Sequence, residues 1–156
     1  MIKKIYIDTS VFGGKFDKEF DDATNLFFDY VIKSEIIIVI SEVLELEILR
    51  APAKVIAFYD SLPEKFIYKV SLTTEASNLA EMYINEKVVG KTSRADCQHI
   101  ALATINNVDV LVSWNFKHIV NLEKIRGYNS INFRQGYQMT EIRTPKEIFS
   151  YENNSN

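Results

Sequence analysis

The sequence predicts a three-layer α/β fold, in which a small, mostly parallel sheet is covered by helices on both sides. Strand-like and helix-like segments alternate along the 156 residues. The run IIIVI at 36–40 is entirely β-branched, which is typical of a strand buried on both faces of a parallel sheet. Because parallel strands need crossover connections, which are usually helices, this alternation indicates a layered domain.

In the first half of the chain, strands are predicted at 2–8, 36–40 and 66–70, and helices at 21–34, 41–50 and 53–60. The helix at 21–34 begins with two acids, which interact favourably with a helix N-terminus. Its apolar residues recur at helical spacing and are expected to face the core: Leu26, Phe27, Tyr30 and Val31. Ser41 is a suitable N-cap for the helix at 41–50.

In the second half, helices are predicted at 73–86 and 93–107, strands at 109–113 and 130–133, and a short final helix from Thr144 and Pro145. Leu79, Met82 and Tyr83 are expected to point inward. Residues 1–150 are therefore expected to form one domain. The polar tail at 151–156 is expected to be disordered.

The charge and composition of the chain exclude several classes of protein. The net charge is −3 and the pI is about 5.5, so a broad basic surface for nucleic acid is absent and any phosphate contact must be local. The single cysteine, Cys97, excludes an internal disulfide and fits a reducing cytoplasm. The N-terminal sequence lacks the features of a signal peptide, and no apolar run approaches the ~20 residues of a membrane span. We therefore expect a cytoplasmic protein without a membrane segment.

An acid, Asp8, stands directly at the end of the first predicted strand. Two small hydroxyl residues, Thr9 and Ser10, follow it in the sequence IYIDTSVFGG. In open α/β sheets, ligands bind beyond the carboxyl ends of the strands, where Asp8 would lie. The alternative is a structural role, because Asp is common in turns and as a helix N-cap. The choice between these roles depends on which other polar residues reach the same edge of the sheet.

A second acid, Glu47, is predicted on the apolar side of the helix at 41–50. At 100° per residue it falls among the apolar side chains, whereas Glu42 points to solvent. A carboxylate turned inward is costly unless it is paired or bound to a metal. The alternative for Glu47 is a salt bridge to Arg50 or Lys54 at the edge of the domain.

A third acid, Asp96, lies in the first turn of the helix predicted at 93–107, on one stripe with His99. Ser93 and Asp96 also resemble a capping box with Asp in place of Glu. That role is compatible with a functional one, since both place the acid at the helix N-terminus. We expect His99 to be a half-buried structural residue rather than a ligand.

Asn115 follows the strand predicted at 109–113 and is expected at the same edge as Asp8. Its amide oxygen can coordinate a hard cation, although Asn is also common in turns. Asp8, Glu47 and Asp96 would then converge with Asn115. Carboxylates gathered without cations repel one another, and an all-oxygen set suits Mg²⁺ or Mn²⁺ rather than zinc. Such a site suits metal-assisted attack of water on a phosphodiester.

Four segments together resemble the PIN domain, the fold of many VapC-type toxin ribonucleases: IDTSVF, SEVLELEI, ADCQHIALA and LVSWNFKHI. They span nearly the whole chain in the expected order. The resemblance implies Mg²⁺- or Mn²⁺-dependent cleavage of RNA, frequent homodimers and inhibition by a small antitoxin protein. It also implies that Asp8, Glu47 and Asp96 are the first three acids of the site. The fourth position is often Asp and is Asn115 here, which lowers the charge of the site by one.

Several polar residues near these positions are candidate substrate contacts: Thr9, Ser10, Arg94 and Lys117. Thr9 or Ser10 would help to position water or metal. Arg94 and Lys117 would contact RNA phosphates, with Lys87, Lys91 and His118 nearby. The alternative for the basic residues is an ordinary solvated surface. Trp114 would stack on a base or pack at the rim of the core.

Two functions remain in view. The first is a metal-dependent PIN-type ribonuclease that acts as the toxin of a toxin–antitoxin pair, on the basis of the three acids and Asn115. The second is a catalytically weakened module that binds RNA or protein, on the basis of Asn115 and the acidic pI. The substitution Asn115→Asp discriminates between them, because it restores the missing charge.

Overall fold

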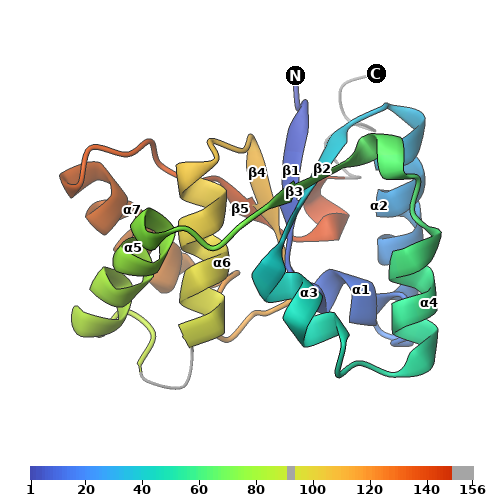
Figure 1. The fold of residues 1–156 in the computed structure, drawn as a ribbon, viewed down its shortest axis with the longest axis horizontal. Helices are drawn as coiled ribbons and strands as arrows, with labels where there is room; N and C mark the ends of the chain where they lie inside the picture. Colours follow the sequence, from blue (N-terminus) through green and yellow to red (C-terminus); the bar gives the residue numbers. More distant parts are fainter. Residues whose placement is uncertain (91–93, 149–156) are drawn as a thin grey trace.

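The computed structural model describes residues 1–90 and 94–148, and its architecture is drawn in Figure 1. The proposed capping residue Ser93, the candidate phosphate contact Lys91 and the polar tail at 151–156 lie outside the described residues. No helix in the described ranges is long and apolar enough to cross a membrane.

Within the described residues, five strands form one sheet in the order β3-β2-β1-β4-β5, and each neighbouring pair is parallel. The strands are β1 Lys4–Ile7, β2 Ile37–Ser41, β3 Ile67–Val70, β4 Val110–Val112 and β5 Ile142–Arg143. β1 lies at the centre, where Tyr6 pairs with Val39 on one side and with Leu111 on the other. The predicted parallel sheet is therefore confirmed.

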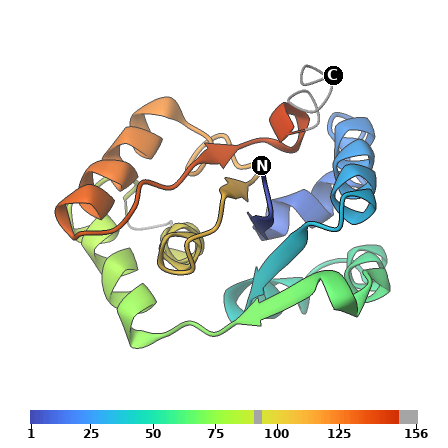
Figure 2. The same ribbon diagram turned by 90° about the horizontal axis from the view of Figure 1, so that it is seen from above.

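Helices cover both faces of this sheet, as Figure 2 shows. They are α1 Thr9–Gly14, α2 Asp21–Lys33, α3 Glu42–Ile48, α4 Ala53–Ser61, α5 Thr74–Asn85, α6 Arg94–Ile105 and α7 Leu122–Arg134, with a short 3₁₀ helix, η1, at Glu64–Phe66. On one face, Tyr6 packs with apolar residues of α5, α6 and α7. On the other, Ile5 and Ile7 pack with residues of α1, α2, α3 and α4. The three-layer α/β/α architecture is confirmed.

The strand predicted at 130–133 is wrong, because these residues form the last turns of α7. The Asn121 side chain caps this helix by accepting a hydrogen bond from the Lys124 backbone N–H. Tyr128 and Ile131 are buried at a spacing of three, which is helical. The last described strand is instead β5. Helix α1 was not predicted; it begins directly after Asp8.

Two expected core residues lie at the surface. Leu26 is 43% exposed, since α2 buries Thr24, Phe27, Phe28 and Val31 instead. Met82 is 36% exposed, although Leu79 and Tyr83 of the same helix are buried as predicted. The remaining helices lie close to their predicted bounds. Ser41 caps α3 as predicted, and its hydroxyl accepts a hydrogen bond from the Leu44 N–H. The short helix predicted near Pro145 is also present, over residues 145–148.

A close contact between α1 and the end of β4 leads to a stability prediction. A Cβ added at Gly14 would lie 2.7 Å from Cδ1 and Nε1 of Trp114 and 2.9 Å from the Thr24 hydroxyl, whereas a Cβ at Gly13 would meet nothing within 4 Å. Overpacking of this kind costs about 2 kcal/mol, so we expect Gly14→Ala to lower the free energy of unfolding. Gly13→Ala, the matched control, is expected to be neutral or stabilising because Ala favours helix. Urea unfolding followed by Trp114 fluorescence measures both; equal stabilities of the two variants would contradict the packing described here.

Candidate active site

Asp8 lies at the carboxyl end of β1 and is 3% exposed. It occupies the N-cap position of α1, but its side chain makes no capping hydrogen bond. Instead, the Ser10 hydroxyl donates to Oδ1 at 2.7 Å and the Ser113 hydroxyl donates to Oδ2 at 2.8 Å. Burial raises the pKa of Asp8 to about 6, against the lowering effect of His99 and of the two hydroxyl groups, and the charge of Asp96 adds to the rise.

The segment after β4 is tied to the same place. The Ser10 oxygen accepts a hydrogen bond from the Trp114 N–H at 2.8 Å, and the Ser113 oxygen accepts one from the Asn115 N–H at 2.9 Å. The two segments that follow β1 and β4 are therefore held together around Asp8. Asn115 lies at this edge as predicted, and its Oδ1 accepts a hydrogen bond from the His118 N–H at 2.9 Å. The turn role weighed for Asn115 is thus present, in addition to its hydrogen bond with Asp96.

Glu47 reaches the same edge of the sheet from α3. Its Oε1 accepts hydrogen bonds from the Thr9 hydroxyl at 2.9 Å and from Nε2 of His99 at 2.6 Å. Its partners are therefore Thr9 and His99 rather than the expected alternatives, Arg50 or Lys54. Burial raises the pKa of Glu47, but the hydrogen bond and charge of His99, together with the Thr9 hydroxyl, outweigh burial and leave the pKa below its usual value.

The expectation of a half-buried His99 is wrong, because its side chain is 1% exposed and links Glu47 to the centre of the sheet. Nδ1 of His99 lies 2.7 Å from the Tyr6 hydroxyl, which donates to the Ser41 hydroxyl at 2.7 Å. An ionised Glu47 can only accept a hydrogen bond, so Nε2 of His99 donates to it. A chain of hydrogen-bonded side chains therefore joins Ser41, Tyr6, His99, Glu47 and Thr9.

Asp96 lies in the first turn of α6 and is partly buried. Burial raises its pKa, and the charge of Glu47 adds to the rise. The charges of His99 and His118 and a hydrogen bond from Asn115 lower it, without cancelling the effect of burial. Because Asp96 acts on the pKa of Asp8 and is itself affected by Glu47, the three acids share one electrostatic environment.

The structure therefore brings the predicted acids and Asn115 to one edge of the sheet. Among the described residues, however, no group of three or more His, Cys, Asp or Glu side chains is arranged to hold a metal ion. Mg²⁺ in proteins is commonly held by one or two carboxylates, with water and substrate oxygens completing its shell. Asp8 and Asp96 supply that set, and each Asp8 oxygen keeps a lone pair beyond its hydroxyl partner.

Two observations fit a cation at Asp8 and Asp96. The pKa of each is raised by burial, with a further rise from a neighbouring acid, so each carboxylate carries negative charge that its surroundings do not fully compensate. Within the described ranges, Nδ1 of His118, whose charge acts on Asp96, is a buried polar atom without a hydrogen-bond partner. The donor chemistry of these residues matches a hard divalent cation.

The four candidate substrate contacts differ in their bonding partners and exposure. Thr9 donates a hydrogen bond to Glu47, and Ser10 donates one to Asp8. Arg94 forms an ion pair with Glu81 of α5. Lys117 is exposed two residues after Asn115. Sequence reasoning missed Ser113, Tyr6 and Ser41; for Tyr6, the available signal was a hydroxyl group within the apolar strand predicted at 2–8.

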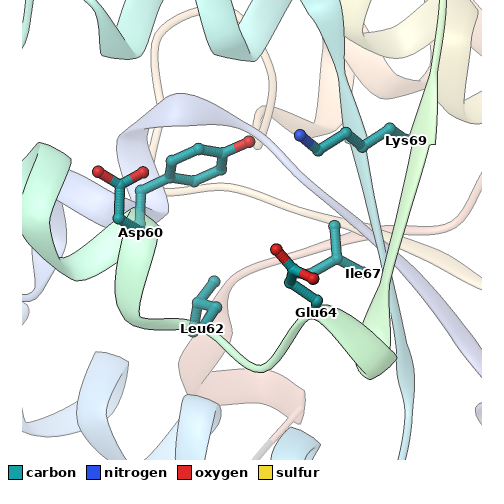
Figure 3. A pocket seen from close by; sticks show the side chains of 6 residues that line it. Asp60, Leu62, Glu64, Ile67 and Lys69 are labelled. Atoms are coloured by element: carbon teal, nitrogen blue, oxygen red, sulfur yellow. The ribbon is translucent and has the colours of Figure 1, made fainter.

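A separate pocket lies between α4 and β3 (Figure 3), with a volume of about 360 Å³. It is lined by Tyr59, Asp60, Leu62, Glu64, Ile67 and Lys69. Tyr59 and Lys69 are both tied to Glu45, the first by a hydrogen bond of 3.2 Å and the second by an ion pair of 3.3 Å. None of the predicted site residues lines this pocket, so it is distinct from the edge of the sheet where Asp8, Glu47 and Asp96 lie.

No protein-family model matches this chain, and no curated protein sequence matches it. Solved structures do share its fold. VapBC2 from Rickettsia felis, bound to a DNA fragment from the promoter, aligns with a TM-score of 0.56 and 12% identity over 90% of this chain and 98% of the other. FitAcB from Neisseria gonorrhoeae aligns with a TM-score of 0.56 and 12% identity over 90% and 97%. FitAB bound to the IR36 DNA fragment gives 0.55 and 12% over 91% and 95%. At this identity the likeness establishes the fold, and the PIN-like architecture expected from the sequence is confirmed.

Proposed function

We propose that this protein is a divalent-metal-dependent ribonuclease and the toxin of a two-component toxin–antitoxin pair. The observation that carries the proposal is the pair of carboxylates, Asp8 and Asp96, whose pKa values are raised at the carboxyl edge of the sheet. This is the edge at which open α/β folds bind their ligands. The similarity to the VapBC2 and FitAB structures supports the PIN-type fold on which the proposal rests.

In this proposal, Asp8 and Asp96 hold Mg²⁺ or Mn²⁺, with Asn115 beside Asp96. The bound cation would polarise a phosphodiester and favour the attack of water on phosphorus. Ser10 and Ser113 keep the Asp8 carboxylate in place, and Glu47 supplies a third carboxylate that His99 and Thr9 keep oriented. Lys117 would contact an RNA phosphate at the rim, where only local positive charge is available.

The proposed partners are single-stranded or structured RNA as substrate, a small antitoxin protein as inhibitor and a second copy of the chain. The similar structures carry two-component names, VapBC2 and FitAB, which supports a protein partner for this chain. The proposed action on RNA fits the cytoplasmic location expected from the sequence. The proposed antitoxin would bind near Asp8 and Asp96 and would block access to their carboxylates.

Induced expression in a bacterial host tests this function. We expect the wild type to arrest growth and to generate new RNA 5′ ends. Asp96→Asn should relieve the arrest, because one of the two proposed metal ligands loses its charge. Asp29→Asn, which removes an exposed acid of α2, is the matched control and should arrest growth like the wild type. Equal arrest by Asp96→Asn, at equal protein level, would contradict the assignment.

One observation favours the weakened binding module: Asn115 uses Oδ1 to cap a turn, as a structural residue would. Asn115→Asp keeps an oxygen for this turn and adds a charge beside Asp96. If the wild-type site is functional, RNA cleavage should change by less than about tenfold, which corresponds to 1.4 kcal/mol. A gain of more than a hundredfold from a nearly inactive wild type would favour the module.

A further inference from the structure

The polar chain that orients Glu47 includes residues of the central strands of the sheet. Tyr6 lies in β1, which is paired with β2 on one side and with β4 on the other. Its hydroxyl is fixed between the Ser41 hydroxyl and Nδ1 of His99, each at 2.7 Å. The imidazole ring of His99 is therefore oriented by the centre of the sheet rather than by a loop, which is the arrangement that holds a side chain most accurately.

Glu47 differs from His99 in its exposure. The side chain of Glu47 is 38% exposed, whereas that of His99 is 1% exposed. Both hydrogen bonds to Glu47, from His99 and from Thr9, meet at Oε1. Two donors on one oxygen fix the direction of the whole carboxylate, and neither uses Oε2. The buried His99 thus holds the partly exposed carboxylate of Glu47 in one direction.

We propose that His99 is a positioning residue, which holds Oε1 of Glu47 so that Oε2 accepts a hydrogen bond from the water that attacks RNA. This inference rests on the proposed nuclease function and divides the three acids by role. Asp8 and Asp96 would hold the cation. Glu47 would form a hydrogen bond with the water and would not bind the cation itself. His99 touches neither substrate nor cation and acts through Glu47.

Mn²⁺ binding, measured by calorimetry on the full chain, tests this division of roles among the three acids independently of RNA cleavage. We expect Glu47→Gln, His99→Gln and Tyr6→Phe to keep the Mn²⁺ dissociation constant within about threefold of wild type, which corresponds to 0.6 kcal/mol. Asp8→Asn should weaken binding by more than tenfold. If Glu47→Gln weakens binding as much as Asp8→Asn does, Glu47 is a direct ligand and the proposal is overturned.

RNA cleavage then separates positioning from stability. We expect His99→Leu to lower kcat by about 100-fold at an unchanged KM for RNA, since misplacing a catalytic group by 1 Å has an effect of this size. His99→Gln should recover most of this loss, because an amide N–H can donate to Oε1. Tyr6→Phe should lower kcat by about fivefold, the effect of one neutral hydrogen bond.

Tyr83→Phe is the matched control for Tyr6→Phe, because it also removes a buried tyrosine hydroxyl, here one bonded to Asn132 in the layer of α5 and α7. It should leave kcat unchanged. Equal losses in the two Phe variants, or a His99→Gln variant as impaired as His99→Leu, would assign His99 a purely structural role. A wild type that cleaves RNA while His99→Leu keeps full kcat overturns this inference alone. A wild type that neither binds Mn²⁺ nor cleaves RNA overturns the proposed function as well.

Discussion

In the absence of metal, Asp8→Asn is expected to be more stable than the wild type at pH 7.5, by up to about 3 kcal/mol. The pKa of Asp8 is raised from 3.8 to about 6 by burial, so the folded state binds its proton more tightly than the unfolded state does. The corresponding stability is fully present below pH ~4 and is lost as the pH rises through ~6. Each unit of pKa shift corresponds to about 1.4 kcal/mol, and Asn avoids the loss because it does not ionise.

Urea unfolding in EDTA between pH 4 and pH 8 measures this difference. The two proteins should have similar stability at pH 4 and diverge as the pH rises. Glu47 acts with the opposite sign, because its lowered pKa contributes stability that is lost in acid, but it is present in both proteins and cancels in the comparison. Asp29→Asn should follow the wild type throughout. An Asp8→Asn variant that is less stable than the wild type at pH 7.5 would contradict a raised pKa of Asp8 in the folded state.

The second large effect is stabilisation by a divalent cation. A ligand that binds only the folded state adds about 2.7 kcal/mol at a hundredfold excess over its dissociation constant. We therefore expect Mn²⁺ to raise the melting temperature of the wild type and to have little effect on Asp8→Asn. Sodium chloride at matched ionic strength is the control, because screening alone weakens repulsion between the acids. An identical response of wild type and Asp8→Asn to Mn²⁺ would show that these carboxylates do not form the site.

The positions of the acids could be predicted because each depends on a local pattern. Asp8 and Asn115 follow strands, and parallel strands bring their carboxyl ends to one edge. Helical periodicity assigned Glu47 and Asp96 to the inward faces of their helices, and this assignment needs no information about the rest of the chain.

The hydrogen bonds around the acids could not be predicted, because they join residues far apart in the sequence. Tyr6 and His99 are 93 residues apart, and the sequence offers no pattern that pairs them. The serine that holds Asp8, Ser113, is 105 residues away from it. The strand predicted at 130–133 failed for a different reason: four residues are too few to distinguish strand from helix, and the stripe of α7 is visible only over the full helix.

The proposed metal-dependent cleavage of RNA depends on the carboxylates of Asp8 and Asp96. Its most direct test is the cleavage of single-stranded RNA by purified wild-type protein, Asp96→Asn and Asp29→Asn, each with Mn²⁺ and with EDTA. We expect cleavage by the wild type and by Asp29→Asn in Mn²⁺, none in EDTA, and a rate at least ~100-fold lower for Asp96→Asn, as for the loss of a group that stabilises the transition state. Cleavage at the same rate by Asp96→Asn, or cleavage that persists in EDTA, would contradict this proposal.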